Sequence, residues 1–133
     1  MRKFLQALAL VGLVGFFVAC SQEPKDMAVS FYEALSSGDG NKALKYINIP
    51  EDVKKEAGAE DLLKGKMADA AAREKKKVDE KGGIASISVL NEELDDQKGR
   101  VFVDLNVSYK NNTNEREHIQ LVKVDGKWMV RLK

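Results

Sequence analysis

Two side chains that occur only once in the chain limit the chemistry that it can perform. The single cysteine, Cys20, permits no disulfide within the chain. The single histidine, His118, excludes a metal site built from several histidines. We therefore expect no metal site and no bound cofactor.

Cys20 follows a segment with the layout of a secretory signal peptide. Arg2 and Lys3 give a positive start, and residues 4–19 are apolar apart from Gln6. As a helix, residues 4–19 would span about 24 Å, at about 1.5 Å per residue. Because a bilayer core is about 30 Å thick, the length argues against an uncleaved transmembrane anchor.

The stretch FVAC, which ends at Cys20, resembles the lipobox of bacterial lipoproteins, although Phe17 stands where Leu is usual. The resemblance implies a diacylglyceryl group on Cys20, removal of the signal peptide 1–19, and acylation of the new amine by a chain such as palmitate. Ser21, in place of Asp, implies a bacterial envelope lipoprotein of the outer membrane that faces the periplasm. Residues 20–24 form a tether of at most about 14 Å beyond the cysteine. The alternative is that Cys20 simply ends a hydrophobic segment.

The composition predicts one globular domain over residues 25–133. Hydrophobic residues make up 44% of the 133 residues and charged residues 32%. Lys and Arg total 22 against 21 Asp and Glu. Removing Arg2 and Lys3 leaves 20 against 21, a net charge of −1. No strongly basic surface exists for nucleic acid, so we expect no nucleic-acid partner.

The first half of this domain has helical spacing. Met27, Phe31 and Leu35 recur every four residues and predict a helix over 23–39. A short helix is expected over 41–47. A longer helical region over 50–83 is expected to break or kink at Gly58, and the pair Gly82 and Gly83 closes it.

The second half alternates with a period of two. Strands are expected over 84–90, with Ala85, Ile87 and Val89 on one face, and over 100–110. Residues 118–132 predict a hairpin that turns at Asp125-Gly126 and places Val122 opposite Met129. The expected inner side of this hairpin consists of Ile119, Leu121, Trp128, Val130 and Leu132. The fold class is therefore α+β, with N-terminal helices packed on one face of a four-stranded antiparallel sheet.

Two stretches, DMAVSFYEALSSGDGNKALKYI and VDGKWMVRL, resemble small bacterial lipoproteins built on the nuclear-transport-factor-2-like (NTF2-like) cone. The group most similar is a domain of unknown function that is sometimes called lumazine-binding-like. This resemblance implies a curved sheet wrapped around helices, with a pocket at the wide end. The superfamily includes enzymes, binding proteins and dimerisation modules, so the fold leaves the function open.

Enzymes of this superfamily carry Asp, His or Tyr inside the cone. Asp104 and His118 are out of phase with their buried neighbours, and both are expected to point away from the helices. Tyr109 has the inward phase, but it ends a strand and is expected to keep its hydroxyl in water. No acid–base pair can be assembled, and we predict no catalytic residue. The alternative is an isomerase-like or dehydratase-like enzyme of the cone superfamily.

The remaining candidates concern binding. Six residues could line a pocket for a small hydrophobic ligand or belong to the core: Phe31, Tyr32, Tyr46, Met67, Tyr109 and Trp128. Apolar residues on the otherwise polar outer sheet face, namely Phe102, Val122 and Met129, could form an interface, including that of a homodimer, or an ordinary exposed face. The leading hypothesis is a membrane-anchored, non-catalytic lipoprotein that binds a small molecule or an envelope protein. A purely structural or dimerising subunit is the third hypothesis.

Overall fold

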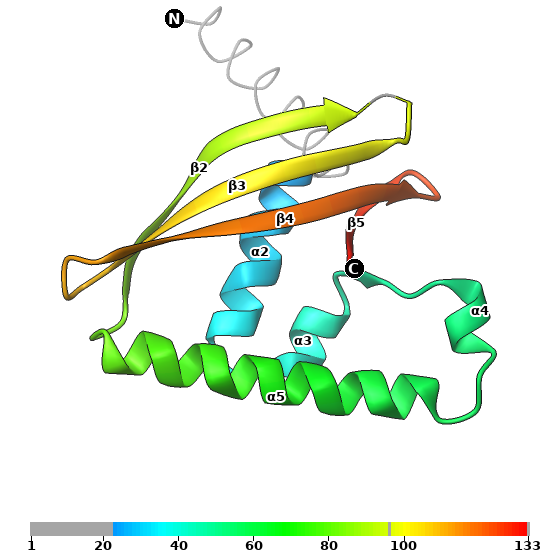
Figure 1. Cartoon of the computed structure of the whole chain (residues 1–133), viewed down its shortest axis with the longest axis horizontal. Coiled ribbons are helices and arrows are strands. Elements are labelled where there is room, and N and C mark those ends of the chain that lie inside the picture. The colour runs from blue at the N-terminus through cyan, green and yellow to red at the C-terminus, as the bar shows by residue number, and fades with distance from the viewer. Residues whose placement is uncertain (1–22, 96, 133) are drawn as a thin grey trace, which may run out of the picture.

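The structure is a computed structural model that describes residues 23–95 and 97–132 (Figure 1). The predicted signal peptide 1–19 and Cys20 lie outside the described residues, as does the tether before Glu23.

The helices begin and end where the sequence places its turn formers. Helix α2 covers Pro24–Ser36, with Pro24 in the first turn, and Gly38 follows it with a φ of 86°. Helix α3 covers Gly40–Leu44, and the Asp39 side chain caps it by accepting a hydrogen bond from the Lys42 N–H at 3.0 Å. The predicted second helix was therefore too long at its C-terminal end.

The expected break at Gly58 is confirmed. Helix α4 covers Glu51–Lys54 and helix α5 covers Ala59–Glu80, with Gly58 between them at a φ of 79°. This left-handed conformation favours glycine, because a Cβ atom would be strained there. Gly82 and Gly83, with φ angles of 84° and 104°, follow α5 and turn the chain into the sheet.

The sheet has five strands, which corrects the predicted four. They are β1 (Ile47–Asn48), β2 (Ile84–Asp95), β3 (Arg100–Tyr109), β4 (Asn114–Val124) and β5 (Lys127–Arg131). Their spatial order is β1-β5-β4-β3-β2. The additional strand β1 pairs in parallel with β5, with Ile47 opposite Val130. Its two residues depend on this distant partner for their hydrogen bonds, so no local period marks them as a strand.

The hairpin of β4 and β5 has the predicted register. Val122 lies opposite Met129 and Leu121 opposite Val130. Asp125 and Gly126 both have positive φ, as a two-residue hairpin turn requires. Leu132 is the exception on the predicted inner side: it follows the last residue of β5 and is exposed.

Strand β2 is longer than predicted and lies at the edge of the sheet. Its pairing with β3 shifts register between Ile84 and Ser86 and again between Val89 and Asn91. Such irregularities insert an extra residue and change the phase of the side chains. Ala85 falls in the first shift and is exposed, which interrupts the predicted alternation of Ala85, Ile87 and Val89.

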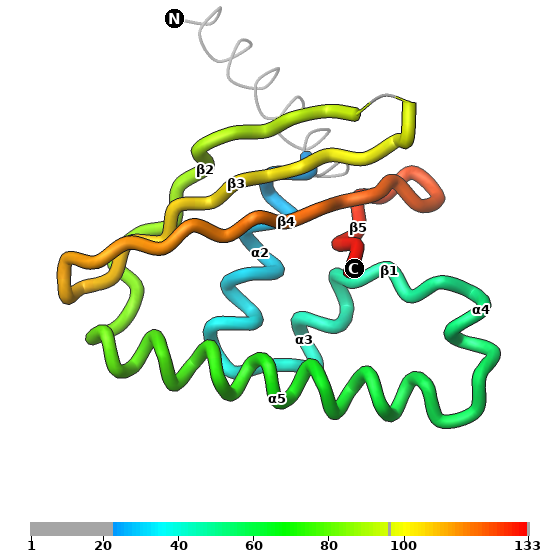
Figure 2. Tube along the Cα trace, in the orientation of Figure 1, coloured from blue at the N-terminus to red at the C-terminus, as the bar shows by residue number. Residues whose placement is uncertain are grey.

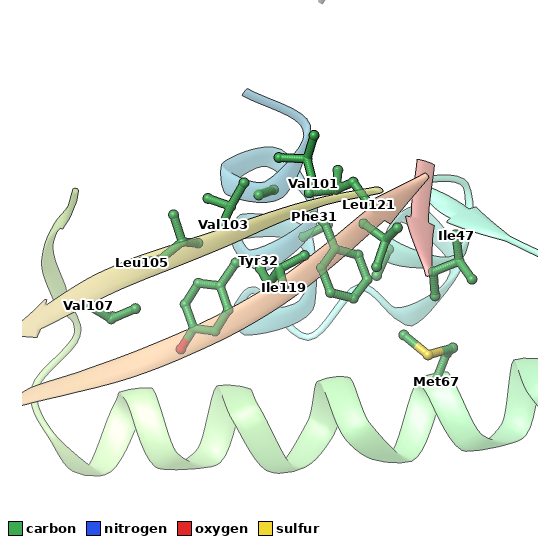
Figure 3. Close-up of a cluster of buried hydrophobic side chains, with 14 of the residues drawn as sticks. Phe31, Tyr32, Ile47, Met67, Val101, Val103, Leu105, Val107, Ile119 and Leu121 are labelled. Atoms are coloured by element: carbon green, nitrogen blue, oxygen red, sulfur yellow. The ribbon is translucent and has the colours of Figure 1, made fainter. Parts of the chain in front are cut away.

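The core lies between the inner face of the sheet and the helices, which all occupy that side (Figures 1 and 2). Every second residue of β3 from Val101 to Tyr109 is buried, as the alternation predicts. Figure 3 shows the side chains from Val101 to Val107 together with Phe31 and Tyr32 of α2, and Met67 of α5 beneath them.

Candidate functional site

The six residues predicted to line a pocket lie in the core or against it. Phe31, Tyr32, Met67 and Tyr109 are buried members of the main hydrophobic cluster. Tyr46 and Trp128 are half-buried and pack against that cluster. Phe31 also borders a shallow hollow of about 210 Å³ beside the end of β5. The structure thus brings these residues together as packing partners.

A polar group of side chains, which we call the inner cluster, lies between α5 and the inner face of the sheet. Its members come from four elements: Tyr32 of α2, Glu74 and Lys77 of α5, Tyr109 of β3, and Glu115 and Glu117 of β4. The Tyr32 hydroxyl donates a hydrogen bond to Glu74 Oε2 at 3.2 Å. The Tyr109 hydroxyl donates to Glu115 Oε2 at 3.1 Å, and the two hydroxyl oxygens lie 3.4 Å apart.

Lys77 bridges the two carboxylates that accept these hydrogen bonds. Its Nζ lies 2.6 Å from Glu115 Oε2 and 3.2 Å from Glu74 Oε1. Glu117 is more distant, with its Oε1 at 4.0 Å from the same ammonium. Lys81 adds a second positive charge 3.5 Å from Glu115, over the ring of Tyr109. The inner cluster therefore ties α2, α5, β3 and β4 together.

The surroundings of each carboxylate set its pKa. The hydrogen bond from Lys77 lowers the pKa of Glu115, and the Tyr109 hydroxyl acts in the same direction. Burial raises the pKa of Glu117, and the negative charge of Glu74 raises it further. Burial alone would lower the pKa of Lys77, but its hydrogen bond to Glu115 and the charge of Glu74 raise it overall. Burial also raises the pKa of Tyr32.

This geometry corrects the expectation for Tyr109. Its side chain is only 2% exposed, and its hydroxyl binds Glu115 instead of water. The hairpin that follows β3 brings Glu115 back beside it, because Val107 pairs with Glu115 across the strands. Within residues 23–95 and 97–132, no buried side-chain nitrogen or oxygen is left without a hydrogen-bond partner. The buried polar atoms of the inner cluster are therefore all paired.

Asp104 and His118 lie on the outer face, as their phase predicts. They are directly opposed across β3 and β4, and Asp104 Oδ1 lies 2.5 Å from His118 Nδ1. The Phe102 ring stacks on the His118 ring with a centroid distance of 5.5 Å and an angle of 17°. These three side chains form one connected group on the face that points away from the helices.

The predicted interface residues surround this group. Phe102, Val122 and Met129 are each half-buried, and Val122 pairs with Met129 across the hairpin. Next to them Arg131 donates a hydrogen bond to Gln120 Oε1 at 3.1 Å. We call the set Phe102, Asp104, His118, Gln120, Val122, Met129 and Arg131 the outer face. Figure 1 shows that the helices of the described chain lie on the opposite side of the sheet.

Nowhere in 23–95 and 97–132 do three or more His, Cys, Asp or Glu side chains come together as ligands for a metal ion. No helix in the same ranges is both long enough and apolar enough to cross a membrane.

Comparisons with known proteins place the chain among domains of unknown function. The family model of the domain of unknown function DUF4878 matches residues 18–131. A crystal structure from Campylobacter jejuni, of a protein that carries the provisional name NTF2-like transpeptidase, is 26% identical, with a TM-score of 0.76. The similarity covers 84% of this chain and 100% of that chain, and it supports an NTF2-like fold. No curated protein matches the chain at a significant level.

Proposed function

The chain belongs to the DUF4878 family of domains of unknown function, and from that premise we propose that it is a lipid-anchored, non-catalytic module of the bacterial envelope that binds a protein partner through the outer face. A second copy of the chain is the other partner that fits this surface.

The observation that carries the proposal is the composition of the outer face. Aromatic and aliphatic side chains at Phe102, Val122 and Met129 lie among groups that can form hydrogen bonds, on a face that no described helix covers. Protein interfaces combine such apolar centres with polar surroundings. The stack of Phe102 on His118, together with the Asp104 contact, holds these side chains in place before binding. A preordered surface loses less side-chain entropy on association.

The interior favours binding over catalysis. The inner cluster contains carboxylates, the ammonium of Lys77 and two phenols, and the phenols and Lys77 are bound to Glu74 and Glu115. The transpeptidase activity in the name of the Campylobacter jejuni protein would require a nucleophile beside a base. In the described part of the chain, His118 is hydrogen-bonded to Asp104, and no hydrogen bond joins it to a serine or threonine.

The envelope location is supported by the sequence before the domain. Arg2 and Lys3, the apolar residues 4–19 and Cys20 together resemble a lipoprotein signal. The family match begins at residue 18 and therefore includes Cys20. Lipid chains on this residue would hold the domain at a membrane surface, since each buried methylene contributes about 0.8 kcal/mol.

The test is site-specific photocrosslinking in cells that produce the full chain. A photoreactive amino acid at Met129 is expected to yield a discrete adduct, and one at the exposed Lys66 of α5, the matched control, is expected to yield none. Val122→Asp should abolish the Met129 adduct, because it introduces an unpaired charge into the contact.

Mass spectrometry of the adduct separates the partners. A product of twice the mass identifies a second copy, and any other protein identifies a heterologous partner. Equal crosslinking from Met129 and Lys66, or an adduct unchanged by Val122→Asp, would show that the outer face is not the binding surface.

A further inference from the structure

Exposed apolar side chains gather on the edge strand of the sheet. Among the large hydrophobic residues that are more than a third exposed, three belong to β2: Val89 at 39%, Leu90 at 49% and Leu94 at 56%. We call these three residues the apolar rim. The other two in the described part of the chain are Leu62 of α5 and Leu132, which follows β5.

Pairing with β3 fixes where the apolar rim points. Val89 lies opposite Leu105 and Leu94 opposite Val101, and both partners are buried on the inner face. Cross-strand partners share a face of the sheet, so Val89 and Leu94 continue the inner face to its edge. Leu90 falls in the second register shift of β2. The apolar rim thus extends the core surface into solvent.

The first turn of α2 lies beside the apolar rim. Helix α2 contacts β2, and Figure 1 shows its first turn behind the arm formed by β2 and β3. The pKa of Lys25 in α2 is raised, mainly by Glu23. The charge of Glu92, which lies between Leu90 and Leu94, is near enough to raise it further. The chain therefore enters the domain next to the exposed edge of the sheet.

The short tether limits how far the start of α2 can lie from Cys20. Cys20 is four residues before Pro24, which allows at most about 14 Å between them. An acyl chain on Cys20 would hold the start of α2, and β2 with it, against the headgroups. We propose that the apolar rim rests in the interface between the headgroups and acyl chains of the membrane that holds the anchor. This inference depends on the lipid anchor of the proposed function.

The negative charges on β2 predict which lipid headgroups the apolar rim prefers. Glu92, Glu93 and Asp95 alternate with or adjoin the apolar rim, and the strand contains no Lys or Arg. Anionic headgroups repel such carboxylates. The apolar rim therefore fits a bilayer of zwitterionic lipid, such as phosphatidylethanolamine, better than one rich in phosphatidylglycerol.

The chain allows a selective test, because acylation of its single cysteine leaves no other thiol. Leu94→Cys in the lipidated protein can be labelled with a polarity-sensitive fluorophore and placed on phosphatidylethanolamine–phosphatidylcholine vesicles that contain brominated lipid. We expect a blue shift and loss of fluorescence. Leu62→Cys, at 63% exposure on α5, is the matched control and should keep the emission of a label in water. Val89→Cys repeats the test if Leu94→Cys folds poorly.

The outcomes distinguish this inference from the lipid anchor itself. Mass spectrometry first establishes whether the protein carries acyl chains, and their absence overturns the anchor together with this inference. If the protein is acylated and bound to vesicles, but labels at positions 94 and 62 are equally exposed to water, the anchor holds and the membrane contact of β2 is wrong. Replacing part of the zwitterionic lipid with phosphatidylglycerol should weaken the quenching at position 94, and stronger quenching would contradict the lipid preference.

Discussion

Glu115 and Glu117 are two residues apart on β4 and face the same lysine, yet their surroundings change their acidity in opposite directions. Glu115 accepts hydrogen bonds from Lys77 and Tyr109, so its ionised form is stabilised and its pKa is lowered. Glu117 is partly desolvated and close to the charge of Glu74, so the pKa of Glu117 is raised. Their contributions to folding stability should therefore have opposite pH dependence.

Two isosteric substitutions test this at the level of residues. Stability from the lowered pKa of Glu115 is present above its unfolded pKa and is lost as pH falls through the folded pKa. Glu115→Gln should therefore lower the free energy of unfolding at neutral pH, by about 1 kcal/mol. Stability from the raised pKa of Glu117 is present below its unfolded pKa and is lost as pH rises through the folded value. Glu117→Gln should therefore raise the free energy of unfolding at neutral pH, by about 0.5 kcal/mol.

Urea denaturation at neutral pH and at a pH below both carboxyl pKa values provides the measurement. Both differences from the wild type should shrink at the lower pH, where the native glutamates are protonated. A loss of stability for Glu117→Gln at neutral pH equal to that for Glu115→Gln would contradict the assigned environments.

The alternation of residues along β4 predicted part of the inner cluster. Glu115 and Glu117 share the phase of Ile119 and Leu121, and the same alternation correctly placed His118 on the opposite face. What the sequence could not supply is the partner. Lys77 is one lysine in a run of charged residues on α5, and its contact with β4 exists only in the folded chain. Glu115 and Glu117 were thus predictable as inward-facing, but the contacts of Glu115 with Lys77 and Tyr109 were not.

At the scale of elements, local patterns predicted α2, α5 and the hairpin of β4 and β5, because each buries its own periodic stripe or carries its own turn. Strand β1 depends on a distant parallel partner, and β2 changes phase at its irregularities. Neither effect leaves a regular period in the sequence. For these reasons the prediction placed Ile47 in a helix and Ala85 in a regular alternation.

The packing of α3 on α5 makes a prediction about two glycines. A Cβ atom at Gly40 would lie 2.8 Å from Ala68 Cα and from the Met67 carbonyl oxygen, whereas one at Gly65 would meet nothing within 4 Å. Gly40→Ala forces the two helix backbones apart and should destabilise the protein by about 1–3 kcal/mol. Gly65→Ala, the matched control within α5, should stabilise it by about 0.5–1 kcal/mol, because alanine favours the helix.

Thermal or urea unfolding followed by circular dichroism checks this pair. Opposite signs are expected from the same chemical change. Similar effects for the two variants would show that α3 does not approach α5 as closely as the structure has it.

At the scale of the whole molecule, two surfaces are left uncovered by the described residues. They face in different directions. The outer face lies on the side of the sheet opposite the helices, and the apolar rim lies at the edge formed by β2 (Figures 1 and 2). A membrane against β2 would leave α5 on the far side of the molecule and the outer face turned sideways. The proposed anchoring and the proposed protein binding would therefore use different surfaces.

The remaining prediction concerns the proposed lipid anchor on Cys20. A serine hydroxyl cannot take the place of the Cys20 thiol in lipoprotein modification, so Cys20→Ser should carry no acyl chain and should retain residues 1–19. Ser21→Asp is the matched control: it keeps the thiol, and the lipoprotein resemblance implies that it should stay acylated but move to the inner membrane. Intact-mass measurement of membrane fractions distinguishes the two variants. If the wild-type protein keeps residues 1–19 and lacks acyl chains, the proposed envelope location is wrong. The proposed membrane contact of β2 is then wrong as well, because it requires a lipid on Cys20.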